Sequence, residues 1–152
     1  MVREIVLDTE TTGLDPLEGH KIIEIGAIEL IDHVKTEKNL HFYINPEREI
    51  PEDSQKIHNI SNEMVKDKPK FGDIYRELLD FIKDDSLVIH NAKFDLKFLN
   101  NELNKIGIGN IQNKIVDTLK IARSKYPGSS VSLDSLCKKF EIDTKERVEK
   151  GH

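Results

Sequence analysis

The stretch IVLDTETTG, residues 5–13, joins an apolar run to two carboxylates that are one residue apart. Its first three residues are aliphatic and predict a buried strand over residues 5–7. Alternate side chains of a strand project from the same face, so Asp8 and Glu10 are expected to point the same way. Two like charges this close raise each other's pKa unless a cation or a donor lies between them. The pair favours a divalent metal ion, although two solvated carboxylates at a strand end would show the same pattern.

Length and composition limit the class of protein. A chain of 152 residues fits one domain, and it has no stretch close to the roughly 20 apolar residues of a membrane helix. The N-terminus leads straight into a strand and lacks a secretion signal, so we expect a cytoplasmic protein. A net charge of −5 argues against a broad basic surface for nucleic acid. It does not exclude a nucleic-acid enzyme, because bound metal ions would supply local positive potential.

The apolar spacing predicts three strands followed by strands that alternate with helices. Successive strands with short links form an antiparallel meander, whereas strands joined through a helix pair in parallel. We therefore expect an α/β fold with a mixed sheet, antiparallel in its first three strands and then parallel, flanked by helices. The predicted elements are strands at 5–7, 21–30, 40–44, 87–89 and 114–119, and helices at 71–82, 91–106 and 132–140.

A third carboxylate, Asp95, falls in the first turns of the helix that follows the strand at 87–89. Ligands of such sheets gather at strand ends and at the adjoining helix starts, so Asp95 is expected to face the same region as Asp8 and Glu10. Its neighbours include Phe94 and Leu96, and a charge in apolar surroundings is costly unless it is paired or bound to metal. An aspartate favoured by the helix dipole is the alternative interpretation.

Three further residues have two interpretations each. His58 is expected in a loop, where an exposed imidazole would press on a base or sugar, or would anchor the loop. Asp117 ends a predicted strand. We expect it to begin a helix or to hold the ligand-binding residues in place, rather than to bind a ligand itself. His152 has a side chain suited to act as general base near neutral pH, but a solvated chain end would look the same.

Four blocks occur in an order that resembles the DEDDh exonuclease family: DTETTG at 8–13, HNI at 58–60, VIHNAKFD at 88–95 and SLDSLC at 132–137. The likeness runs from residue 3 to the end, and within the family it is greatest to the proofreading exonucleases of bacterial DNA polymerase III. It implies a ribonuclease H-like fold and a single exonuclease domain over residues 1–152.

The resemblance also implies a reaction and its residues. Two divalent ions, Mg²⁺ or Mn²⁺, would be held by Asp8, Glu10 and Asp95, with His152 as the catalytic general base. The substrate would be a single-stranded or frayed DNA 3′ end, because unpairing costs least at a mispaired terminus, and the product a nucleoside 5′-monophosphate. The residues implied to contact the terminal nucleotide are Asp8, Glu10, Thr11, Thr12, Asp53 and His58.

One departure from the family pattern concerns the end of the sequence. Relatives carry a fourth metal-binding carboxylate after the histidine, on a last helix that covers the sheet, whereas this sequence stops at His152. We expect that helix to be absent, together with the tail that tethers relatives to the polymerase catalytic subunit and reaches the sliding clamp. Two alternatives stay open: an exonuclease acting on RNA 3′ ends, and a catalytically weakened docking module.

A site with three carboxylates is expected to hold its second ion weakly. We therefore predict lower exonuclease activity for residues 1–152 than for a chain extended beyond the fourth carboxylate. Nucleotide release by the two chains, compared side by side, measures the difference. Equal turnover of both at saturating manganese would contradict this expectation.

Overall fold

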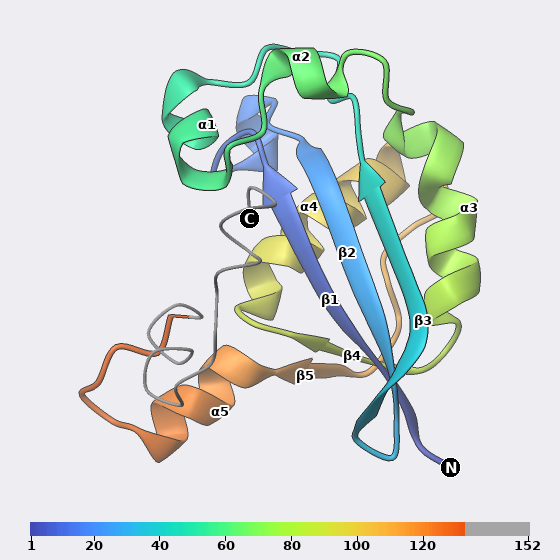
Figure 1. Ribbon diagram of the computed structural model, residues 1–152, viewed down its shortest axis with the longest axis vertical. Coiled ribbons are helices and arrows are strands. Elements are labelled where there is room, and N and C mark those ends of the chain that lie inside the picture. Colours follow the sequence, from blue (N-terminus) through green and yellow to red (C-terminus); the bar gives the residue numbers. More distant parts are fainter. Residues whose placement is uncertain (133–152) are drawn as a thin grey trace.

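A computed structural model shows a twisted mixed sheet with helices packed around it (Figure 1). The structure describes residues 1–132, so His152 and all but the first residue of the predicted helix at 132–140 lie outside the described residues. The elements are β1 (Arg3–Thr11), η1 (Pro16–Glu18), β2 (Ile22–Ile31), β3 (Val34–Tyr43), α1 (Glu52–His58), α2 (Asn62–Val65), α3 (Phe71–Ile82), β4 (Ser86–Ile89), α4 (Ala92–Lys105), β5 (Ile115–Asp117) and α5 (Thr118–Lys125).

The sheet has the strand order β3-β2-β1-β4-β5, with β1 at its centre. The β1–β2 and β2–β3 pairs are antiparallel, whereas β1–β4 and β4–β5 are parallel. This arrangement confirms the predicted mixed sheet. The β1–β4 pairing is short and involves only Glu4, Ile5 and Val6 of β1. The second half of β1 therefore has no strand on its β4 side.

The main core lies between the sheet and the helices α3 and α4. In α3 the buried residues follow helical spacing, at Phe71, Ile74, Leu78 and Ile82, so one stripe of the helix packs against the sheet. The helix α4 passes behind β1 and β2 in Figure 1 and places Phe98 in the same core. Packing on this scale fixes α4, including its first turn, relative to β1.

A second, smaller cluster lies beneath α1 and α2, over the end of β1. A β-bulge between Glu10 and Thr11 leaves Ile23 of β2 without an opposing residue on β1. Bulges redirect the side chains around them, and Ile23 packs with Ile50, Ile60 and Val65 instead of joining the main core. The bulge thus separates the carboxylate-bearing part of β1 from the part that meets α1.

The structure corrects several of the predicted elements. β1 covers Arg3–Thr11 rather than 5–7, β3 begins at Val34 rather than at residue 40, and α5 was not predicted. The strand predicted at 114–119 ends at Asp117, because Thr118 and Leu119 begin α5. The helices α1 and α2 were not predicted, since both are short and the only large aliphatic residue of α1, Ile57, is 79% exposed. Among residues 1–132 no helix has the length and apolar character needed to cross a membrane.

Asp117 fastens α5 to the start of α4. Its carboxylate caps α5 by accepting the Leu119 N–H at 2.9 Å, and it also accepts the N–H groups of Asn91 at 3.0 Å and Ala92 at 3.1 Å. Burial raises the pKa of Asp117, but these hydrogen bonds outweigh it and hold the pKa below its usual range. This placement agrees with the expectation that Asp117 begins a helix.

Replacing Asp117 with alanine is expected to lower the free energy of unfolding by about 1–2 kcal/mol. The substitution removes the cap of α5 and also the carboxylate that accepts the two N–H groups at the start of α4. Urea unfolding followed by circular dichroism measures the change. Asp117→Asn keeps one acceptor oxygen and should cost less than Asp117→Ala. Equal stability of the alanine variant and the original chain would show that the carboxylate does not hold the two helices.

Candidate functional site

The open edge of β1 beyond β4 is filled by a side chain from α4. Asp95 lies in the first turn of α4 and is only 4% exposed. Its Oδ2 atom accepts hydrogen bonds from the backbone N–H and from the Oγ1 hydroxyl of Thr9, each at 3.1 Å. A carboxylate thus satisfies a backbone donor that no neighbouring strand reaches. This contact brings Asp95 to the strand that carries Asp8 and Glu10.

Asp8 and Glu10 project from the face of β1 opposite to its buried side chains. Residues 5, 7, 9 and 11 are buried, whereas Asp8 is exposed and Glu10 is half-buried. This alternation is what an extended strand imposes, and it gives the two carboxylates a common face, as the sequence predicted. Both therefore remain accessible to a ligand from solvent.

The three carboxylates interact electrostatically. Burial, and then the charge of Asp8, raise the pKa of Asp95 to about 8, with a smaller contribution from Glu10. The two hydrogen bonds from Thr9 act in the opposite direction but are outweighed. A cation bound among the three groups would favour their ionised forms and remove this repulsion.

The donor set fits a hard divalent ion. Carboxylate oxygens are preferred ligands of Mg²⁺ and Mn²⁺, and Mg²⁺ in proteins often keeps several water ligands beside one or two carboxylates. Within residues 1–132, however, no three His, Cys, Asp or Glu side chains are grouped so that they could hold a metal ion. Metal binding by Asp8, Glu10 and Asp95 therefore stays a prediction.

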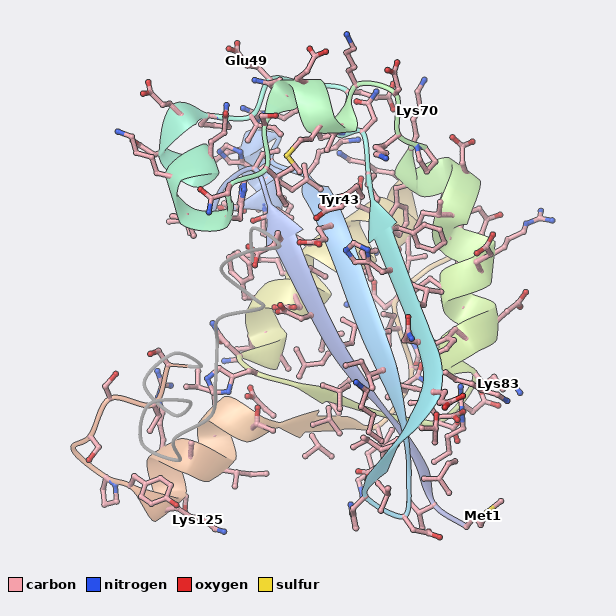
Figure 2. The ribbon with its side chains drawn as sticks, in the orientation of Figure 1. Met1, Tyr43, Glu49, Lys70, Lys83 and Lys125 are labelled. Carbon is pink, nitrogen blue, oxygen red and sulfur yellow. The ribbon has the colours of Figure 1, made fainter. Side chains whose placement is uncertain are left out.

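A polar group that the sequence interpretation missed lies next to this site. Glu24 of β2 is the register partner of Glu10 and is 3% exposed. Its Oε2 atom lies 2.5 Å from Nε2 of His41 on β3, and Tyr43, labelled in Figure 2, follows on the same strand. A cavity of about 320 Å³ on this sheet face is lined by Asp8, Glu10, Glu24 and His41 among others. The signal in the sequence was a carboxylate, one of two in β2, placed between isoleucines.

Thr11 is the last residue of β1 and Thr12 follows it, at the place where α1 contacts the strand end. The Thr11 hydroxyl donates to the Gly13 carbonyl at 2.6 Å, and the Thr12 hydroxyl accepts the Lys21 N–H at 3.0 Å. Ser54 of α1 donates to the Thr12 carbonyl at 2.6 Å. Both threonines are buried. Their predicted contact with a nucleotide stays a prediction, as does that of Asp53, which is exposed on α1.

The prediction of an exposed His58 in a loop was wrong, whereas its alternative role as an anchor stays a prediction. His58 is the last residue of α1 and is 2% exposed. Burial lowers the pKa of His58, and the nearby backbone of Thr11 raises it by a smaller amount. Nδ1 accepts the Ile60 N–H at 3.1 Å, so the neutral ring carries its proton on Nε2. Among the described residues Nε2 has no hydrogen-bond partner of good geometry.

Sequence comparison shows that this chain is similar to known exonucleases. A family model described as Exonuclease matches residues 5–152. The DNA polymerase III subunit epsilon of Rickettsia felis is 54% identical over 150 residues, which cover 96% of this chain and 66% of the relative. The protein of the same name in Buchnera aphidicola is 46% identical over 157 residues, covering 98% of this chain and 67% of the relative. The chain thus spans about two thirds of the length of these curated relatives.

Solved structures give the same fold. Exonuclease X in complex with 5′ overhanging duplex DNA superposes with a TM-score of 0.73 at 26% identity, covering 93% of this chain and 75% of that one. The nuclease domain of 3′hExo, a DEDDh family member bound to rAMP, gives a TM-score of 0.81 at 22% identity, covering 98% and 84%. The mixed sheet found here is therefore that of ribonuclease H-like exonucleases.

The high pKa of Asp95 predicts a pH-dependent stability in the absence of divalent ions. Because the folded-state pKa lies above the usual value of 3.8, the folded protein binds the proton more tightly than the unfolded chain. Stability is therefore expected to fall as pH rises from about 4 to 8, by at most about 1.4 kcal/mol per pH unit.

Thermal unfolding of the original chain and of Asp95→Asn in chelator, across this pH range, measures the effect. The asparagine variant should not show the loss of stability that is due to Asp95. Added Mg²⁺ should raise the stability of the original chain but not that of the variant. Asp80→Asn, which changes an exposed carboxylate on α3, is the matched control. Parallel pH profiles of all three proteins would contradict the assignment.

Proposed function

We propose that this chain, which belongs to the exonuclease family, removes nucleotides one at a time from the 3′ end of DNA. The products would be nucleoside 5′-monophosphates, and frayed mispaired ends would be the preferred substrates because they cost least to unpair. The observation that carries the proposal is the buried Asp95 carboxylate, which accepts the N–H of Thr9, the residue between Asp8 and Glu10, and whose pKa is raised by burial and by the charges of both.

Asp8 and Glu10 from β1 and Asp95 from α4 would together hold two divalent ions, Mg²⁺ or Mn²⁺. Such ions lower the pKa of an attacking water and stabilise the leaving 3′ oxygen. Thr9 fixes the orientation of Asp95 through its two hydrogen bonds, so a ligand oxygen is held in place before substrate arrives. His152, which follows the described residues, would take the proton from the water.

The terminal nucleotide would bind where β1 meets α1. Thr11, Thr12, His58 and the exposed Asp53 are the residues proposed to contact it. The Nε2–H group of His58 is a buried donor without a partner of good geometry in the described part of the chain. A buried donor of this kind is costly unless a ligand or a small movement satisfies it.

The relatives suggest a setting for this activity. Proteins at 54% and 46% identity carry the name DNA polymerase III subunit epsilon. We propose by analogy that this chain serves proofreading during replication and works with the polymerase catalytic subunit and the sliding clamp in the cytoplasm. These partners would dock through parts of the relatives outside the matched segment.

The test is release of nucleotide from 3′-labelled single-stranded DNA in Mg²⁺ and in Mn²⁺. Asp8→Ala should reduce release by at least about 100-fold, because it removes an expected metal ligand. Asp80→Ala, the same substitution at an exposed site on α3, should behave like the original chain. An RNA strand of the same sequence, run in parallel, tests the alternative substrate.

The outcomes separate the candidate functions. Metal-dependent release from DNA that is lost only in Asp8→Ala supports a DNA exonuclease, and faster release from RNA would favour the RNA enzyme. Binding of a 3′ end without any release in either metal would favour a docking module and overturn the proposal.

A further inference from the structure

A second cavity lies beside the active site, on the α5 side of the molecule. It has a volume of about 830 Å³, within the range of about 300–1,000 Å³ that is typical of ligand pockets. One wall is the turn after β4, at His90 and Asn91. The other wall is α5 and the loop that follows it, including Arg123, Tyr126 and Ser129. In Figure 1 α5 lies beyond the ends of β4 and β5.

The two cavities differ in charge. Three carboxylates and one lysine, Lys35, line the cavity on the sheet face. Among the described residues that line the second cavity there is one arginine and no Asp or Glu. Residues 114–125 carry four cations and one carboxylate, in a chain of net charge −5. That one carboxylate, Asp117, is occupied by backbone N–H groups. An anion is therefore better tolerated along α5 than on the sheet face.

Hydrogen bonds connect the walls of the second cavity to the start of α4. Asp117 fastens the turn at Asn91 to the start of α5, and this turn leads directly into the helix that carries Asp95. His90 adds two contacts, from Nδ1 to the Thr118 hydroxyl at 2.9 Å and from Nε2 to the Val131 carbonyl at 2.8 Å. The walls of the cavity and a proposed metal ligand thus share one hydrogen-bonded unit.

We propose, resting on the proposed exonuclease function, that this cavity binds the nucleic-acid strand on the 5′ side of the bond to be cut. A strand whose 3′ end is held at Asp8, Glu10 and Asp95 must leave across a neighbouring surface. Away from the proposed metal ions, Glu24 in the sheet-face cavity would repel its upstream phosphates, whereas the α5 cavity offers a cation and hydroxyl groups. Arg123 is assigned as the residue that binds an upstream phosphate.

The chemistry of the lining residues fits this class of ligand. An arginine guanidinium binds phosphate oxygens in a bidentate manner, and serine hydroxyls and backbone N–H groups commonly contact phosphate and sugar. The Tyr126 ring lines the same cavity, and aromatic rings stack on bases of single strands with little sequence preference. The site would therefore bind a single strand with little preference for its base sequence.

The experiment compares Arg123→Gln with Lys125→Gln on substrates of different length. Lys125, labelled in Figure 2, is a cation at the end of the same helix but is not among the residues that line the cavity. The short substrate is the p-nitrophenyl ester of thymidine 5′-monophosphate, which has no upstream phosphate. The long substrate is an oligothymidylate of eight nucleotides.

For Arg123→Gln we expect the ratio of KM for the oligonucleotide to KM for the ester to rise about ten-fold, as for loss of one charged hydrogen bond at an exposed site. The plot of log KM against log salt concentration should also become shallower by about 0.7, the value for one phosphate contact to a single strand. Lys125→Gln should change neither quantity.

Two failures can be told apart. If Arg123→Gln and Lys125→Gln give the same KM ratio and the same salt dependence, the α5 cavity does not bind the strand and this inference is wrong. If the original chain hydrolyses neither substrate in Mg²⁺ or Mn²⁺, the proposed exonuclease function itself fails. Circular dichroism of both variants confirms that each is folded before the comparison is made.

Discussion

The fold depends on how the open edge of its central strand is closed. Because β4 pairs with β1 only as far as Val6, the next part of β1 needs an acceptor for a backbone N–H group. Asp95 supplies it, and this requirement brings a buried carboxylate to within the electrostatic reach of Asp8 and Glu10. This hydrogen bond and the packing of α4 in the main core together hold Asp95 in its buried position. Burial and the charge of Asp8 then raise its pKa, against the smaller effect of the hydrogen bonds from Thr9. The cost of that burial makes a bound cation favourable at this place in the sheet.

Net charge is a poor guide to the ligands of this chain. Its overall charge of −5 arises from carboxylates spread over the whole sequence, yet the residues around α5 form a locally basic region. Local fields of opposite sign on neighbouring surfaces guide a charged ligand more than the total charge does. An acidic protein can thus bind a polyanion if its carboxylates are neutralised by metal and its cations lie along the path of the strand.

Much of this architecture follows from local patterns, and the failures have physical causes. Alternating and helical apolar spacing identified the sheet and the helices α3 and α4, and the strand-end rule placed Asp95 near Asp8. The helices α1 and α2 were not predicted because neither has an apolar stripe of its own. The helix α2 is capped by Ser61, whereas α1 has no side-chain cap and rests on a few tertiary contacts. The burial of His58 has the same origin, since it is imposed by the neighbouring end of β1. Glu24 was missed because an isolated carboxylate in a strand becomes meaningful only when the register places it opposite Glu10.

The small cluster under α1 and α2 has a consequence for how the protein opens. Segments with few buried contacts unfold locally at a lower free energy than the core around them. Since α1 and α2 rest mainly on Ile23, Ile50, Ile60 and Val65, they form a unit that can detach while the main core stays packed. Such an opening would uncover Thr11 and Thr12 but leave Asp95 bonded to Thr9. The opening of α1 and α2 and the integrity of the contact between Asp95 and Thr9 therefore depend on separate hydrophobic clusters.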